Sequence, residues 1–139
     1  MNVKTTKKQV TALSYAITGH AIKVHKSLGP GLLESVYEKC LKHELISNGY
    51  KVIQQLKVPI HYNGIFLESD LKLDLMVDDT VIIEIKALES IAPVHEAQLL
   101  TYMKLLEKPQ GLLMNFYSDN LTKGLKPLVN EYFKKLPEK

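Results

Sequence analysis

The chain has 139 residues, 45% of them hydrophobic, with 15 acidic side chains, 18 basic side chains that are all lysine, and a single cysteine. This length suits one domain over residues 1–139 with a core of its own, and one cysteine excludes a disulfide framework. No apolar run reaches the roughly 20 residues of a membrane span and the chain begins rich in lysine, so we expect a cytoplasmic protein without a membrane partner.

Helical and strand patterns follow one another along the chain. Apolar residues at helical spacing predict helices, and apolar residues at every second position predict strands. Asn63-Gly64 is a strong hairpin signal, because both residues accept a positive φ. In chain order the sequence predicts helices over 5–26 and 32–47, strands over 51–62, 65–77 and 81–87, a helix over 94–107, a strand over 111–117 and a helix over 124–136. This order, ααβββαβα, is typical of a mixed α/β or α+β fold with one central sheet flanked by helices.

The register between the strands at 65–77 and 81–87 decides which polar residues meet, because side chains alternate across a strand. This register needs a three-residue turn at 78–80, or an equivalent bulge, and places Asp74 opposite Glu84. Its apolar pairs are Val77 with Val81, Leu75 with Ile83, and Leu73 with Ile85.

Two facing carboxylates repel one another unless something neutralises them. Oxygen ligands suit hard cations, so the expected cofactor is Mg²⁺ or Mn²⁺. Lys86 lies two residues beyond Glu84 on the same face, within reach of a phosphate, and the register places Lys72 opposite Lys86. Ordinary charges on a half-exposed sheet face explain this spacing equally well.

Three short motifs resemble those of the PD-(D/E)XK nuclease superfamily. Asp74 followed by Glu84-Ile85-Lys86 resembles its core, although Leu73 replaces the proline of the name. The segment from Gly31 to Tyr37 resembles the signature of its GxxExxY branch, and Gln98 to Tyr102 resembles the QxxxY helix motif of its RecB-like nucleases. The resemblance runs from about residue 17 to residue 128.

The resemblance implies a restriction-endonuclease-like fold and a metal-dependent nuclease that hydrolyses phosphodiester bonds, in DNA more than in RNA. Lys86 would position or activate the attacking water, and Gln98 and Tyr102 would orient the site or the scissile phosphate. The metal ligands that it implies are Asp74, Glu84 and Glu34, and the residues that it assigns to the reaction are Lys86, Glu34, Gln98 and Tyr102.

Other interpretations stay open. The same fold can serve as a binding module for nucleic acid or protein without hydrolysis, or the acids can be incidental in a structural protein. An acid such as Glu34 is favoured in a first helical turn by the helix dipole alone, Tyr37 is expected to pack in the core, and Gln98 and Tyr102 can form the polar edge of an amphipathic helix. So small a domain is compatible with a homodimer, and the sequence contains no base-reading motif.

Overall fold

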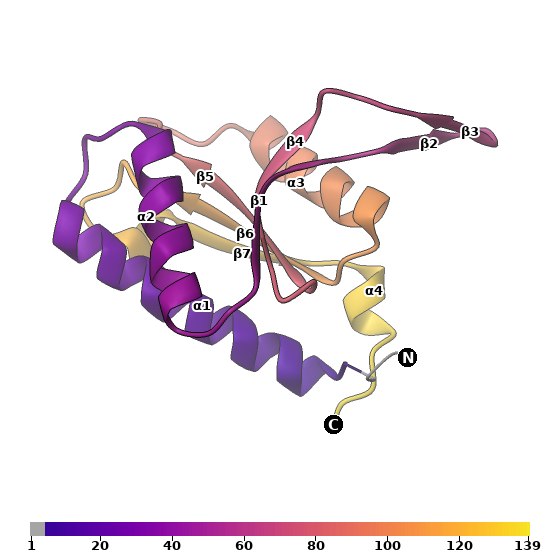
Figure 1. Ribbon diagram of the computed structural model, residues 1–139, viewed down its shortest axis with the longest axis horizontal. Helices are drawn as coiled ribbons and strands as arrows, with labels where there is room; N and C mark the ends of the chain where they lie inside the picture. Colours follow the sequence, from indigo (N-terminus) through magenta and orange to yellow (C-terminus); the bar gives the residue numbers. More distant parts are fainter. Residues whose placement is uncertain (1–4) are drawn as a thin grey trace.

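The computed structural model describes residues 5–139 and shows a central mixed sheet between helices (Figure 1). The elements are α1 Lys7–Leu28, α2 Glu34–Ser47, β1 Val52–Lys57, β2 Ile60–Tyr62, β3 Ile65–Leu67, β4 Lys72–Val77, β5 Val81–Lys86, α3 Pro93–Leu106, β6 Gln110–Asn115, the 3₁₀ helix η1 Leu121–Gly124, β7 Leu125–Val129 and α4 Glu131–Lys134. The five-stranded sheet has the order β1-β4-β5-β6-β7. Strands β5 and β6 are parallel and the other neighbours are antiparallel. The predicted fold class is therefore confirmed.

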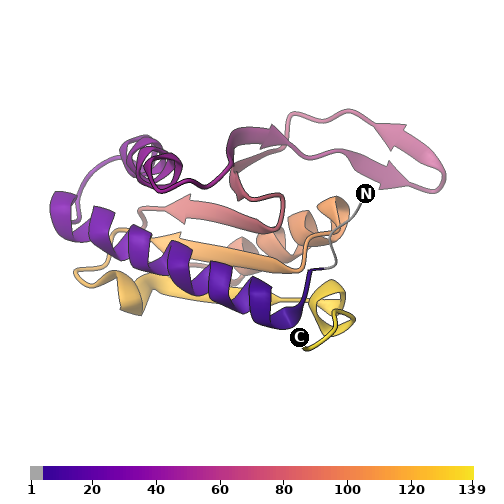
Figure 2. The same cartoon turned by 60° about the horizontal axis from the view of Figure 1, so that its bottom comes forward.

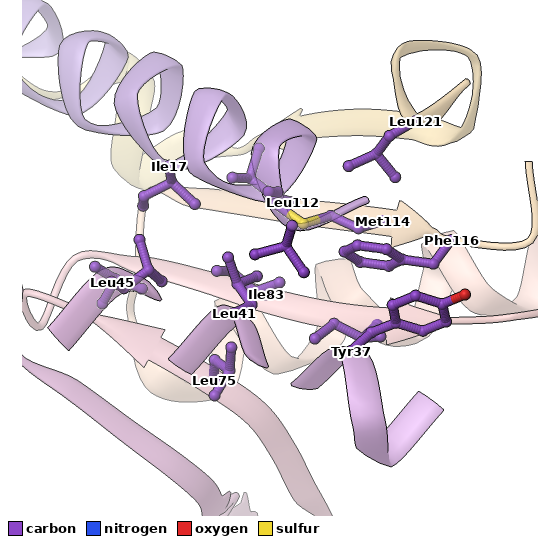
Figure 3. Close-up of a cluster of buried hydrophobic side chains, with 14 of the residues drawn as sticks. Ile17, Tyr37, Leu41, Leu45, Leu75, Ile83, Leu112, Met114, Phe116 and Leu121 are labelled. Atoms are coloured by element: carbon purple, nitrogen blue, oxygen red, sulfur yellow. The ribbon is translucent and has the colours of Figure 1, made fainter. Parts of the chain in front are cut away.

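Helices cover both faces of the sheet (Figure 2). Helices α1 and α2 bury their apolar stripes against one face, where a large core cluster forms (Figure 3). Helix α3 covers the other face with a smaller cluster. No helix in residues 5–139 is long and apolar enough to cross a membrane.

Tyr37 fixes the connection between α1 and α2. Its ring is fully buried and stacks on Phe116 with the ring centroids 4.5 Å apart (Figure 3). Its hydroxyl donates to the Gly29 carbonyl at 2.6 Å and accepts from the Leu32 amide at 3.1 Å. Gly29 and Gly31 both have positive φ, which glycine adopts without strain. The expected core position of Tyr37 is confirmed, and its bonds set where α2 begins.

The two long strands predicted over 51–62 and 65–77 are each divided. Strands β2 and β3 form a separate two-stranded sheet that projects from the body (Figure 1). The hairpin at Asn63-Gly64 is confirmed, since both residues have positive φ and Tyr62 pairs with Ile65. The chain breaks before β4 because the Ser69 hydroxyl donates to the Val58 carbonyl and accepts from the amide two residues on. A serine that bonds locally in this way competes with a sheet ladder.

The predicted final helix over 124–136 is wrong in its first half. Residues Leu125–Val129 form β7, an edge strand that pairs antiparallel with β6, and only Glu131–Lys134 are helical. Pro127 lies in β7 opposite Leu112. Proline lacks the N–H that a helix interior needs but is tolerated on the edge of a sheet, which explains the strand.

Candidate active site

The pairing between β4 and β5 stops at the predicted acids. The ladder joins Val77 to Val81 and Leu75 to Ile83, as the apolar pattern predicts, with the three-residue turn between them. Beyond Leu75 the ladder ends, and Leu73 joins the cluster under α3 rather than that of Leu75. The predicted common face of Leu73 and Leu75 is therefore wrong, because the alternation breaks at the residue between them.

Asp74 and Glu84 take the place of the missing ladder bonds. The Asp74 amide donates to Glu84 Oε1 at 3.1 Å, and the Ile85 amide donates to Asp74 Oδ2 at 2.8 Å. Each carboxylate thus accepts a hydrogen bond from the backbone of the opposite strand. The two acids are brought together as the register predicts, through bonds that the register alone does not reveal.

Burial opposes the ionisation of both acids. Burial, and after it the charge of Asp74, raises the pKa of Glu84 from its ordinary 4.5 to about 8. Burial is also the largest cause of the raised pKa of Asp74, at about 6, against which the Ile85 amide acts. Glu84 is only 5% exposed. A strongly perturbed acid pair of this kind is a signature of functional sites, because holding two charges here is costly without a counter-ion.

A lysine and a tyrosine lie beside the pair. The charge of Lys86 acts to lower the pKa of both Asp74 and Glu84. Within the part of the chain that the structure describes, Lys86 forms no ion pair within 4.0 Å. On α3, burial first and then the charges of the two acids raise the pKa of Tyr102, which places its phenol in their field. Lys86 and Tyr102 are therefore neighbours of the acid pair.

The predicted pairing of Lys72 with Lys86 is not found. The β4–β5 ladder ends before Lys72, which instead lies opposite Lys57 of β1. The cause is the same interruption at Asp74.

A third acid, Glu38, reaches the pair and was missed from the sequence. Glu38 is 7% exposed on α2, and its Oε2 accepts from the side-chain amides of Gln54 at 2.7 Å and Gln55 at 2.9 Å. The Gln55 amide also donates to Asp74 Oδ1 at 3.2 Å. The charge of Glu38 raises the pKa of both Asp74 and Glu84.

The backbone of Gln55 explains how this bridge forms. Gln55 has φ 54°, an unusual conformation for a residue other than glycine, and it lies where β1 would pair with Asp74. The β1–β4 ladder skips this position. Strand β1 is therefore also distorted at the level of the acids, and the distortion presents the glutamine amide to two carboxylates.

The remaining predicted residues do not join the acid pair. Glu34 Oε2 accepts from the Ala87 amide at 3.2 Å, so it sits at the end of β5 next to Lys86. Gln98 is exposed on α3, one helical turn before Tyr102. Glu38 lies four residues after Glu34 and thus on the same helix face, a spacing that was visible in the sequence.

The acid pair fits a hard divalent cation by its chemistry. Its donors are carboxylate oxygens, and an added positive charge would offset the repulsion that raises both pKa values. In residues 5–139 no group of three or more His, Cys, Asp or Glu side chains is arranged to hold a metal ion. The predicted set of Asp74, Glu84 and Glu34 is therefore not assembled, because Glu34 is bonded to the end of β5 instead.

The five-stranded mixed sheet with helices on both faces is consistent with a restriction-endonuclease-like fold. The chain belongs to the PD-(D/E)XK nuclease superfamily, whose family model matches residues 11–128. Proteins of this superfamily are usually nucleases and generally use divalent metals. No curated protein and no solved structure matches the chain significantly.

Proposed function

We propose that the protein is a divalent-metal-dependent phosphodiesterase of the GxxExxY branch that hydrolyses nucleic acid, DNA in preference to RNA. The observation that carries the proposal is the acid pair Asp74 and Glu84 at the break of the sheet, with the ammonium of Lys86 beside it. Membership of the superfamily supports the class of reaction, and the acid pair would bind the metal ion that this reaction needs.

Each residue of the proposed site has a distinct task. Asp74 and Glu84 would hold Mg²⁺ or Mn²⁺, with the Ile85 carbonyl as a further ligand. Such an ion lowers the pKa of a bound water and offsets the charge that develops on the reacting phosphate. The Lys86 ammonium would donate hydrogen bonds to the attacking water and to a phosphate oxygen.

The α2 and α3 residues would orient the groups that react. Tyr102 and Gln98 lie on one face of α3 and would hold the acid pair and the phosphate in position. Glu38, through Gln55, would fix the rotamer of Asp74. Glu34 is bonded at the end of β5, where it would hold the backbone that carries Lys86.

Cleavage of several forms of DNA tests this function. Supercoiled, linear duplex and single-stranded DNA are incubated with Mn²⁺ and either the wild type, Lys86→Ala or the control Lys26→Ala. Lys26 is an exposed lysine in the last turn of α1. We expect Lys86→Ala to cut at least about 100-fold more slowly, the usual cost of losing one charge-stabilising donor, and Lys26→Ala to cut normally. The proposal fails if the wild type cuts none of these substrates or if both variants cut equally well.

The second candidate is a binding module that does not hydrolyse its ligand. It is favoured by the bonds already made within the acid pair, since Asp74 Oδ2 and Glu84 Oε1 each accept from the opposite backbone. A module of this kind would bind DNA without cutting it under any metal, and Lys86→Ala would weaken that binding only slightly.

A further inference from the structure

A polar pocket opens at the carboxyl ends of the two parallel strands, one strand away from the acid pair. The pocket has a volume of about 280 Å³ and lies between the β5–α3 connection, the end of β6 and the start of β7. Strands β5 and β6 run in the same direction (Figure 2). Ligands of α/β sheets commonly bind in the crevice outside the carboxyl ends of parallel strands.

The pocket is directly adjacent to the proposed reacting groups. Two of its lining residues, Leu113 and Asn115, are the register partners of Glu84 and Lys86 on the neighbouring strand. Register partners in a parallel pair point to the same face of a sheet. The pocket therefore continues the site sideways along the sheet, on the face that α3 covers.

The walls of the pocket are fixed by hydrogen bonds. The Asn115 side chain accepts from the Leu88 amide at 3.0 Å and donates to the Leu88 carbonyl at 2.8 Å, which holds the β5–α3 connection. On the opposite wall, a Cβ at Gly124 would lie 2.4 Å from the Asn115 carbonyl oxygen. Only glycine lets the chain approach so closely, so the pocket is a preformed feature of the fold.

The lining matches a nucleobase better than a phosphate. Lys123 and Lys126 are balanced by Glu89 and Glu96, and Lys126 forms an ion pair with Glu96 at 3.3 Å. A pocket without net positive charge does not favour an isolated phosphate.

A nucleobase, by contrast, has a flat apolar face and an edge with both donors and acceptors. The pocket offers aliphatic walls together with hydroxyl, ammonium and carboxylate groups. Its volume is just below the roughly 300–1,000 Å³ of small-molecule sites, which suits one base rather than a base pair. The aliphatic walls include Ile91, Leu113 and Leu125.

We propose that this pocket takes an unpaired nucleobase of the substrate strand, next to the phosphate held at Lys86, so that the protein acts on single-stranded or locally unpaired nucleic acid. This inference rests on the proposed function and specifies its substrate. A base in a duplex would have to leave its stack at a cost of a few kcal/mol, whereas an unpaired base enters without that cost.

Binding in EDTA tests the inference without any cleavage. Fluorescence anisotropy is measured with a labelled single strand, the matching duplex and a single strand that carries an abasic position. Ser90 is an exposed lining residue, so Ser90→Trp would fill the pocket without disturbing the core. The matched control is Ser47→Trp, at the exposed end of α2.

We expect the wild type and Ser47→Trp to bind the single strand about tenfold more tightly than the duplex, because an unpaired base enters the pocket without leaving a stack. We expect Ser90→Trp to lose that advantage, because its side chain occupies the space of the base. The abasic site is placed at each position of the strand in turn. At one position it should weaken binding of the strand to the wild type but not to Ser90→Trp. A DNA strand and an RNA strand of equal sequence show which sugar is preferred.

The inference is overturned if both tryptophan variants bind alike, if the duplex binds as tightly as the single strand, or if the wild type binds neither. These outcomes are separate from those of the cleavage test. Cleavage of duplex and single strand at equal rates by the wild type and Ser90→Trp would overturn the pocket and leave the proposed nuclease intact.

Discussion

Replacing Glu84 by glutamine should stabilise the metal-free protein at neutral and alkaline pH. Glutamine keeps an oxygen that can accept from the Asp74 amide, and it removes the charge that burial and Asp74 oppose. The wild-type acid has a raised pKa, so its contribution to stability is fully present below about pH 4.5 and is lost as the pH rises through about 8. The advantage of Glu84→Gln over the wild type should therefore grow across that interval.

The size of the effect follows from the pKa of Glu84. At about 1.4 kcal/mol per pH unit, the interval from 4.5 to about 8 corresponds to at most about 5 kcal/mol. The other charges that face this carboxyl come from Asp74 on β4, Lys86 on β5 and Glu38 on α2. Because Asp74 titrates in the same interval, we expect about 2–3 kcal/mol, or about 10 °C in Tm for a chain of this size.

Thermal unfolding in EDTA at pH 5 and pH 8 measures this difference. The control is Glu44→Gln, because hydrogen bonding to His20 lowers the pKa of Glu44 and its loss should not stabilise the protein at any pH. An advantage of Glu84→Gln that is equal at the two pH values, or that is larger at pH 5, would refute the buried charge pair.

Three further experiments test residues that shape the site and its surroundings. Tyr37→Phe removes the hydroxyl that bonds the Gly29 carbonyl and the Leu32 amide. It should lower the free energy of unfolding, measured in urea, by about 1–3 kcal/mol. Gly124→Ala should lower the Tm of the protein more than Gly111→Ala does. A Cβ at residue 124 would lie 2.4 Å from a backbone oxygen, whereas the atom nearest to a Cβ at residue 111 is the sulfur of the flexible Met103 side chain, at 2.8 Å. Glu38→Gln should lower the pKa of Glu84, followed by carboxyl NMR titration, whereas Glu34→Gln should change it less.

Each of these expectations has a clear contrary result. Equal stability of Tyr37→Phe and the wild type would mean that the two bonds do not hold the α1–α2 connection. A larger loss for Gly111→Ala would show that the core under α3 tolerates less change than the wall of the pocket. A larger pKa change for Glu34→Gln would restore Glu34 as the acid that acts on the pair.

The sequence predicts the register of β4 and β5 because that register depends only on which apolar residues share a face. Val77 with Val81 and Leu75 with Ile83 follow from burial alone, and Asp74 near Glu84 follows from them. The same logic fails one residue further on. The ladder ends where the carboxylates of Asp74 and Glu84 accept hydrogen bonds from backbone amides. The alternation of apolar and polar residues along a strand does not predict such bonds.

Glu38 was missed for a related reason. The GxxExxY signature draws attention to Glu34, and the sequence gives no sign that Gln55 takes a positive φ. That conformation brings the Gln55 amide to both Glu38 and Asp74. A polar residue that bridges distant segments is set by tertiary structure, which local propensity cannot supply.

The break in the sheet gives the two acids a structural role in addition to the metal-binding role that we propose for them. Asp74 and Glu84 accept hydrogen bonds from backbone amides that the ladder leaves unpaired. Replacing both acids by apolar residues would therefore leave those amides buried without a hydrogen-bond partner. The oxygens of the two side chains can accept these bonds as ions, as protonated acids or, at Glu84, as an amide. Only the ionised form suits a divalent cation, and it is the form that burial disfavours. Glu84→Gln should for this reason raise the stability of the protein and lower its activity at the same time. This trade-off is expected where a site must hold a charge whose burial destabilises the folded protein.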